Sequence, residues 1–333
     1  MPALTVRKHL FAKNDLPAEL NPFPVSPLHG LRLLCAVCIV VTVVLVLPRT
    51  VPAEDVMEWG GDVDVLDVSV AVDNVCAWPN LTLLADGSVA ALIFNKPSHG
   101  LVEGDVDCYV SVDEGRTWEY RGTPAPHEPG TARMNHAAGV ASDGSLVALC
   151  SGWGGADLRE YILPVMVCRS ADGGRTWDRS YDVDVPGDMP DLIPYGDVVR
   201  VHSGMIAVTA YDAFYGAGQN RAYVLSSVDD GHTWRLYGKL GQYRSGGKAP
   251  DTFLNFNETA MIPLTRTSWI AAARRYVRGA DLQYLVSDNA GRYWRVPEEY
   301  RTSGLTGESE HPGHLLRLAD GRILLTYGIR HGE

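Results

Sequence analysis

Side chains that could process a sugar recur along this 333-residue chain, next to apolar segments. Carboxyl groups and arginines follow one another at Glu103, Asp105, Asp197, Glu258, Arg274 and Arg330. Two carboxyl groups can hydrolyse a glycosidic bond, one as the acid and the other as nucleophile or base. Arginine binds carboxylates through two parallel hydrogen bonds. Together these residue types indicate a carbohydrate ligand, including one that carries an acidic group.

Other candidates for the same site could donate hydrogen bonds to a sugar or cover its face: His99, Asn135, His136, Tyr195 and His314. Several candidates also have a structural alternative. Asp197 could cap a turn, and His136 and His314 could be satisfied histidines of the core. Glu258 is the sharpest candidate, because it precedes the apolar stretch 260–264 and so falls at the expected start of a strand.

A repeated motif indicates which strands and turns position these residues. The segments 111–118, 170–177 and 227–234 share the pattern Ser-x-Asp-x-Gly-x-Thr-Trp, and 287–294 is a worn copy. Their serines are 59, 57 and 60 residues apart. Aspartate and asparagine hold tight turns through backbone amides, glycine adopts positive φ, and tryptophan packs as an apolar anchor. The motif therefore predicts a structural hairpin rather than a catalytic site.

Three segments also contain a second hairpin signal, an Asp-Gly turn between two apolar runs. It occurs within segments 81–94, 137–149 and 315–327. Asp-Gly turns favour two-stranded hairpins. Each repeat is therefore expected to form four short antiparallel strands, and a radial array of such units is a β-propeller. Complete blades end near residues 122, 181, 238 and 298, and a fifth begins at Glu310, which makes about four and a half blades in an all-β chain.

The strand order sorts the connections onto two faces. In a four-stranded antiparallel unit, the first and third turns lie on one face, and the second turn and the connection to the next unit lie on the other. The Asp-Gly turns and the repeated motifs share the first face. The second face gathers the candidate site residues, which are expected to converge at the mouth of a central channel.

The repeated motif is the Asp-box, or BNR repeat, and the region from about residue 72 to 333 resembles the non-viral sialidase (neuraminidase) superfamily of six-bladed β-propellers. The resemblance implies that Glu258 and Arg274 are the family's glutamate and second arginine, and that Arg330 is the third. It makes Asp105 the acid/base residue, with Glu103 and His99 as competitors. The family's first arginine is absent from the aligned triplet Ala77-Trp78-Pro79.

The same resemblance places the nucleophilic tyrosine in a later blade, beyond Glu333. The chain is therefore expected to be a C-terminally incomplete piece of a longer protein. The expected function is that of a sialidase-like exo-glycosidase, which hydrolyses terminal sugars of glycans, including anionic ones. The alternative is a propeller that binds carbohydrate or protein without catalysis. A structural cell-surface propeller is the third hypothesis.

The N-terminal segment 1–53 is expected to direct export, and residues 54–333 to form the propeller. Residues 33–47 are an apolar run preceded by Arg32, and a small-residue pattern ends at Ala53. A run of this length fits the apolar region of a signal peptide better than a membrane span. The prediction is a secreted, periplasmic or cell-surface protein, with a cleaved signal or an anchor in which residues 33–47 form the membrane tether.

Charge and motifs exclude other classes of function. The formal net charge of −11 argues against nucleic-acid binding. No dinucleotide, phosphate-loop or zinc pattern appears, so neither cofactor nor metal is expected. The cysteines Cys76, Cys108, Cys150 and Cys168 would remain in the mature chain, either as buried thiols or with one disulfide among them.

Overall fold

The computed structural model describes part of the chain: residues 4–10, 70–75, 77–187, 189, 191–201, 204–213, 220–240, 242–243, 252–253, 255–275, 281–297 and 312–330. Within these residues the secondary structure is entirely β, with no helix. It follows that no helix in the described part of the chain could cross a membrane. The predicted signal run 33–47 lies outside the described residues.

The first Asp-box belongs to an antiparallel sheet of four strands in sequence order. We call this sheet unit 1; it contains β2 (Ala77–Leu83), β3 (Val89–Phe94), β4 (Val106–Ser111) and β5 (Glu119–Ala125). The predicted Asp-Gly turn joins β2 to β3, and Asp86 Oδ1 accepts the amide of Ser88 at 3.0 Å. Gly87 has a φ of 89°, which explains the glycine in this turn.

Units 2 and 3 repeat this order. Unit 2 contains β6 (Thr131–Val140), β7 (Leu146–Gly154), the short β8 (Tyr161–Ile162), β9 (Met166–Ser170) and β10 (Asp178–Ser180). Unit 3 contains β12 (Ile193–Arg200), β13 (Ile206–Ala213), β14 (Asn220–Ser227) and β15 (Trp234–Lys239), with β11 (Val183–Asp184) parallel to β15. Strand β12 also pairs in parallel with β6, so units 2 and 3 join in one ten-stranded sheet.

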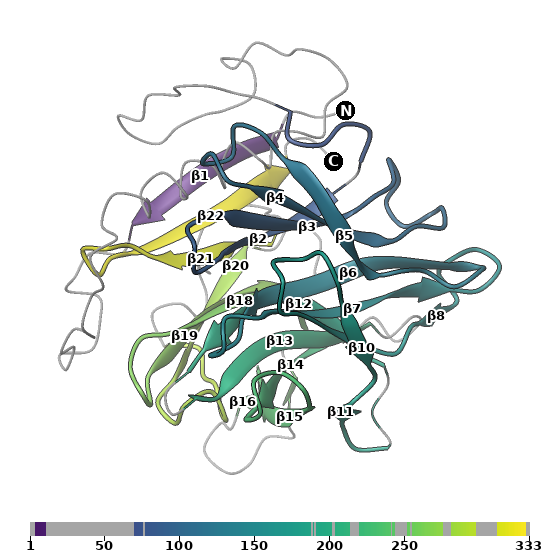
Figure 1. Ribbon diagram of the computed structural model, residues 1–333. Coiled ribbons are helices and arrows are strands. Elements are labelled where there is room, and N and C mark those ends of the chain that lie inside the picture. Colours follow the sequence, from purple (N-terminus) through teal and green to yellow (C-terminus); the bar gives the residue numbers. More distant parts are fainter. Residues whose placement is uncertain are drawn as a thin grey trace.

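The rest of the chain follows the same plan with fewer strands. Unit 4 contains β18 (Phe256–Pro263), β19 (Trp269–Arg275) and β20 (Leu282–Ser287), preceded by the pair β16 (Gln242–Tyr243) and β17 (Thr252–Phe253). A last hairpin joins β21 (His314–Arg317) to β22 (Ile323–Arg330). Strand β1 (Leu4–Leu10), within the segment expected to direct export, lies antiparallel to β22 (Figure 1).

The first strand of each unit lies on the inside of the array. These inner strands are β2, β6, β12, β18 and β21, and neighbouring members contact one another in that order. The sheets fan outward from them in a curled arrangement (Figure 1). We call the space between the inner strands the channel. Strands β2, β6, β12 and β21 border a cavity of about 380 Å³ there, which Asp197, Arg200, His314 and Arg317 help to line.

The Asp-boxes make the same hydrogen bonds in units 1 to 3. In the second box, Asp172 accepts the Ser170 hydroxyl at 2.8 Å and the Thr176 hydroxyl at 2.6 Å, and Trp177 donates its indole N–H to the carbonyl of Gly174 at 2.9 Å. The third box reaches unit 2, because Asp230 Oδ1 accepts the amide of Ser142 in the Asp-Gly turn. This contact puts boxes and Asp-Gly turns on one face.

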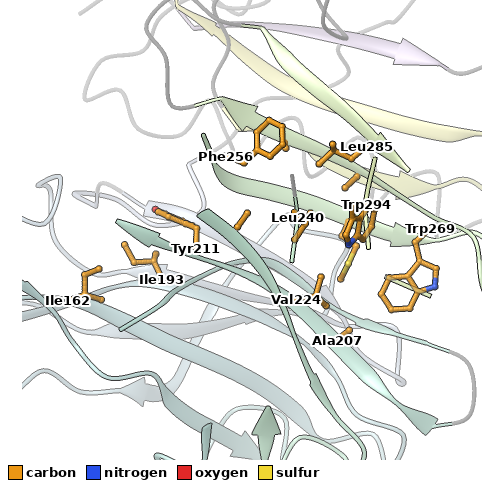
Figure 2. Close-up of a cluster of buried hydrophobic side chains, with 14 of the residues drawn as sticks. Ile162, Ile193, Ala207, Tyr211, Val224, Leu240, Phe256, Trp269, Leu285 and Trp294 are labelled. Atoms are coloured by element: carbon orange, nitrogen blue, oxygen red, sulfur yellow. The ribbon is translucent and has the colours of Figure 1, made fainter. Parts of the chain in front are cut away.

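Apolar side chains pack between the units. The cluster between units 1 and 2 contains Cys108, Cys150 and Cys168. All three are buried free thiols, so the structure has the first of the two alternatives for them, buried thiols rather than a disulfide. Cys76 lies outside the described residues. A larger cluster reaches from Phe94 of unit 1 to Trp294 after unit 4. Figure 2 shows part of it, with Ile162, Ile193 and Tyr211 on one side and Trp294 and Trp269 on the other. This packing joins side chains from neighbouring units.

Candidate functional site

Four inner strands carry a β-bulge at the end where the candidate residues occur. The register shifts between Ala77 and Asn80 in β2, between Ala132 and Asn135 in β6, between Tyr195 and Val199 in β12, and between Phe256 and Thr259 in β18. A bulge re-aims side chains and is common beside active sites. The bulged segments contain or adjoin Asn80, Asn135, Asp197 and Glu258.

Glu258 and Arg274 form an ion pair. Arg274 Nη1 lies 2.6 Å from Glu258 Oε2, and the two side chains are 27 % and 14 % exposed. Burial alone would lower the pKa of Arg274, but the charge and hydrogen bond of Glu258 outweigh it and raise that pKa. The guanidinium therefore stays charged in a partly dry environment, where it can hold an anionic group.

Tyr195 is half-buried beside this ion pair. Burial first, and then the negative charges of Glu258 and Asp197, raise the pKa of its phenol. The hydroxyl therefore stays protonated at neutral pH and acts as a hydrogen-bond donor. In the structure it donates to the carbonyl oxygen of Gly313 at 3.4 Å, a long bond.

Asp197 connects three inner strands across the channel. Its Oδ1 accepts a hydrogen bond from Asn80 Nδ2 at 3.0 Å, and its Oδ2 lies 2.7 Å from His314 Nε2. Burial would lower the pKa of His314, but the charge and hydrogen bond of Asp197 outweigh it and raise that pKa. We call Glu258, Arg274, Tyr195, Asp197 and His314 the channel group.

Glu103 and Asp105 lie in a second cluster, on the connection from β3 to β4. His127 stands between them: its Nδ1 is 2.6 Å from Asp105 Oδ1 and its Nε2 is 3.4 Å from Glu103 Oε2. Burial raises the pKa of Asp105, but hydrogen bonds from the backbone and ring of His127 and from Asn95 outweigh it, so that pKa is lowered. We call Glu103, Asp105, His127 and Asn95 the rim group.

Two predicted histidines lie elsewhere. His136 is buried, with its ring nitrogens 2.8 Å from the carbonyl of Leu92 and 3.2 Å from that of Met134. Burial lowers its pKa to about 4, so the ring is neutral and donates to one of the two carbonyls, which fits a core histidine better than a ligand contact. His99 packs against Trp78, with ring centroids 4.4 Å apart.

Two predicted residues remain, Asn135 and Arg330. The buried Oδ1 of Asn135 has no hydrogen-bond partner among the described residues, so a ligand hydroxyl could satisfy it. Arg330 ends β22, and its side chain lies outside the described part of the chain.

His127 was missed by sequence reasoning, because a single histidine between prolines carries no motif. Within the described residues, no group of three His, Cys, Asp or Glu side chains could hold a metal ion.

Comparison with known proteins shows the fold. The sequence matches no protein-family model and no curated protein. The structure is similar to a protein of unknown function from Dyadobacter fermentans, with a TM-score of 0.62 and 20 % identity over 77 % of this chain and 76 % of that one. It is also similar to the Hadza microbial sialidase Hz136, with a TM-score of 0.59 and 18 % identity over 79 % and 57 % of the two chains.

A third similar structure is the Trypanosoma rangeli sialidase in complex with the inhibitor DANA, with a TM-score of 0.54 and 15 % identity over 78 % of this chain and 45 % of that one. This chain thus spans about half the length of the two sialidases. The structural similarity shows a shared fold, and identity this low says nothing about activity. The chain has a sialidase-like β-propeller fold.

Proposed function

We propose that this chain is part of an exported exo-glycosidase that removes terminal sugars, including anionic ones, from glycans. The observation that carries the proposal is the Glu258–Arg274 ion pair beside Tyr195. The proposed ring has six four-stranded blades, to which units 1 to 4 and the last hairpin contribute. The substrate is a glycan or glycoconjugate, and the reaction needs no cofactor.

The proposed roles follow the chemistry of each group. Arg274, together with Arg330, holds an anionic substituent of the sugar. Asp105 protonates the leaving oxygen, and Glu258 polarises the attacking tyrosine that the sialidase resemblance assigns to a later blade. The other predicted contacts, His99, Glu103, Asn135, His136, Tyr195, Asp197 and His314, surround this reaction as substrate-binding or supporting residues.

Hydrolysis by the full-length protein, of which this chain is a part, tests the proposal. We expect cleavage of at least one member of a panel of aryl glycosides that includes a sialoside and neutral sugars. Glu258→Gln keeps a hydrogen bond to Arg274 but loses the charge, and should lower kcat/KM by about 100-fold or more. Glu119→Gln is the matched control, because Glu119 is 68 % exposed and pairs only with Arg121 at the surface. Unchanged hydrolysis by Glu258→Gln would refute the proposed role.

The second candidate is a propeller that binds glycans without cleaving them. Two observations favour it: Ala77-Trp78-Pro79 lacks the family's first arginine, and the rim group keeps Asp105 in its anionic form. It predicts retention of the chain on a glycan array with no release of free sugar. It also predicts that Arg274→Met weakens this binding, because the substitution removes the cation and keeps most of the side-chain volume.

A further inference from the structure

Two donors from one residue reach the same oxygen of Asp105. The backbone N–H of His127 donates to Asp105 Oδ1 at 2.7 Å, and Nδ1 of the His127 ring lies 2.6 Å from that oxygen. An ionised carboxyl group only accepts hydrogen bonds, so Nδ1 carries a proton in this contact. Each oxygen of a carboxylate has about two acceptor positions. His127 therefore fills both positions on Oδ1.

The second oxygen of Asp105 has fewer donors. Among the described residues, the hydrogen bond to Oδ2 comes from Asn95 Nδ2 and is long, at 3.2 Å. The same Nδ2 makes a shorter hydrogen bond of 2.9 Å to Oδ2 of Asp107. One acceptor position on Asp105 Oδ2 therefore remains for a proton. The two oxygens of this carboxyl group are thus not equivalent, and Oδ2 is the one that can exchange a proton with a substrate.

Glu103 orients the far side of the imidazole ring. Its Oε2 lies 3.4 Å from Nε2 of His127, and its Oε1 accepts the amide of Gly130 at 2.9 Å, which fixes the carboxyl group in position. A protonated imidazole donates from both nitrogens, so it is attracted to Asp105 on one side and to Glu103 on the other. These contacts hold the ring in the orientation that directs Nδ1 toward Asp105.

We propose that His127 is a positioning residue that makes Oδ2 of Asp105 the oxygen for both proton transfers, an inference that rests on the proposed function for the role of Asp105 as acid and base. In the first step Oδ2 gives its proton to the leaving oxygen. In the second step the same Oδ2 takes a proton from the attacking water, which restores the acid. His127 keeps its hydrogen bonds to Oδ1 in both states, because a carboxylate oxygen and the carbonyl oxygen of a carboxylic acid both accept them. No proton moves through the ring.

The same contacts adjust the acidity of Asp105. Burial alone would raise the pKa of Asp105, but the hydrogen bonds from His127 and Asn95 outweigh burial and lower that pKa. Donors to a carboxyl group stabilise its anion, so the neutral acid releases its proton more readily. Loss of the ring donor should therefore make Asp105 a weaker acid.

Other charged side chains near Asp105 have contacts of their own. Asp107 takes a hydrogen bond from the amide that also serves Asp105. Glu128 forms an ion pair with the buried Arg133 at 3.0 Å. Lys96 packs with its aliphatic stem against the backbone that precedes Asp105. Among the described residues, the imidazole is the group in ion-pair contact with Asp105.

Two matched substitutions of His127 test the inference in the full-length protein. The side-chain nitrogen of asparagine lies as many bonds from the backbone as Nδ1 does, and that of glutamine as many as Nε2 does. His127→Asn therefore keeps a donor to Asp105 Oδ1, whereas His127→Gln moves it away. On a methyl glycoside, His127→Gln should lower kcat/KM about ten-fold or more, and His127→Asn should stay within about three-fold of the wild type. Equal losses in the two variants would overturn the inference.

The leaving group distinguishes a misplaced acid from a general structural defect. A para-nitrophenolate leaves with little help from an acid, whereas methoxide must be protonated as it leaves. His127→Gln should therefore lower kcat/KM for the para-nitrophenyl glycoside of the same sugar only about two-fold or less. On the methyl glycoside, the high-pH limb of its kcat/KM–pH profile should move up by about one pH unit, because the loss of a donor raises the pKa of Asp105. Equal losses on the two glycosides would contradict the positioning role.

NMR titration of isotope-labelled aspartate carboxyl groups tests the contact without any need for activity. The Asp105 signal is assigned by its loss in Asp105→Asn. Its midpoint should rise by about one pH unit in His127→Gln and stay near the wild-type value in His127→Asn and in the surface control Glu119→Gln. A midpoint that is the same in His127→Gln and in the wild type would overturn the inference.

The two kinds of measurement separate this inference from the proposed function. An active enzyme in which His127→Gln and His127→Asn behave alike refutes the positioning role and leaves the hydrolase intact. A full-length protein that cleaves no glycoside refutes the hydrolase, and the NMR midpoints then decide alone whether His127 holds Asp105.

Discussion

Two histidines near the channel respond to their surroundings in opposite ways. His136 is buried against backbone carbonyls, and the loss of water lowers its pKa to about 4. His314 also loses water, but the negative charge of Asp197 outweighs that loss and raises its pKa. The difference lies in the partner, because a full carboxylate charge stabilises an imidazolium far more than a carbonyl dipole does. The surroundings of His136 favour the neutral ring, and those of His314 favour the charged ring.

The neutral state of His136 makes stability depend on pH. Its folded pKa of about 4 lies below the ordinary value of 6.5, so the unfolded chain binds a proton first as the pH falls. Between pH 7 and pH 5 the wild type should lose about 2 kcal/mol of unfolding free energy through this group. His136→Gln should remove that part of the pH dependence, as measured by urea unfolding at both pH values.

The control for this experiment is His232→Gln, because His232 is exposed in the third Asp-box. It should show the same difference between pH 7 and pH 5 as the wild type. A His136→Gln variant with an unchanged pH dependence would mean that His136 takes up its proton readily in the folded chain.

At the residue scale, two side chains can be predicted to meet when they lie on consecutive strands of one hairpin. Glu258 and Arg274 lie on the antiparallel strands β18 and β19, so sixteen positions bring them together. His127 meets Asp105 from a connection 22 positions away, and no periodicity relates the two. The Asp197–His314 contact joins residues 117 positions apart and depends on how the inner strands meet. Sequence reasoning therefore named Asp105, Asp197 and His314 without pairing them, and it missed His127.

At the scale of elements, the Asp-box is a self-contained turn. In the second box, Asp172 accepts hydrogen bonds from the hydroxyl of Ser170, the amide of Arg175, and the amide and hydroxyl of Thr176. These bonds lower the pKa of Asp172. In the fourth box Asn289 accepts only the Ser287 hydroxyl and the Tyr293 amide, since tyrosine replaces the threonine. The worn copy keeps the turn with fewer bonds.

This contrast predicts unequal effects of two matched substitutions. Asp172→Ala should lower the unfolding free energy by about 2 kcal/mol, because it removes several hydrogen bonds to a charged group. Asn289→Ala should lower it by about 1 kcal/mol or less. Because the pKa of Asp172 is lowered in the folded state, its contribution is present above the ordinary value of 3.8 and is lost as the pH falls below it.

Chemical denaturation of both variants at pH 6 and pH 3 measures these effects. The difference between Asp172→Ala and the wild type should shrink at pH 3, whereas that of Asn289→Ala should not change. Equal losses in the two variants would show that the carboxylate adds nothing to the turn.

The strand units follow from the spacing of the boxes and Asp-Gly turns, and the structure contains hairpins where these turns were predicted. The bulges could not be predicted in this way. An inserted residue leaves the alternation of apolar side chains intact on either side, and its place is set by the partner strand. The parallel pairing of β6 with β12 could not be predicted from the sequence either, because it joins residues about 60 positions apart, such as Ala137 and Gly196.

At the scale of the whole molecule, arginines bind successive units together. Arg200, near the end of β12, donates to the carbonyls of Val140 and Ala141 in unit 2, and Arg317 at the end of β21 donates to Leu264 in unit 4. Arg179 of unit 2 donates to the carbonyls of Thr123 and Pro124 in unit 1. Neighbouring units are therefore expected to unfold together.

Buried thiols provide a measurement of this cooperativity. Cys108 of unit 1 packs with Cys150 and Cys168 of unit 2, and burial raises the pKa of Cys108 to about 12. All three should resist an alkylating reagent in the native protein and should become reactive at one common denaturant midpoint, as measured by mass spectrometry of the labelled peptides.

An introduced cysteine at Val112, which is 74 % exposed, is the positive control and should react at once. Labelling of Cys108 at a lower denaturant concentration than Cys150 would show that unit 1 opens independently of unit 2.

The link from Asn80 through Asp197 to His314 has a consequence for how the protein matures. Its two hydrogen bonds each connect residues 117 positions apart, so neither can form until the intervening units have folded. Contacts with such long sequence separation form late, because the loop between them must first be ordered. The cavity that Asp197 and His314 help to line is therefore expected to be complete only after these units have folded. An immobilised ligand would retain only finished molecules, and chromatography on it would separate them from arrested folding intermediates.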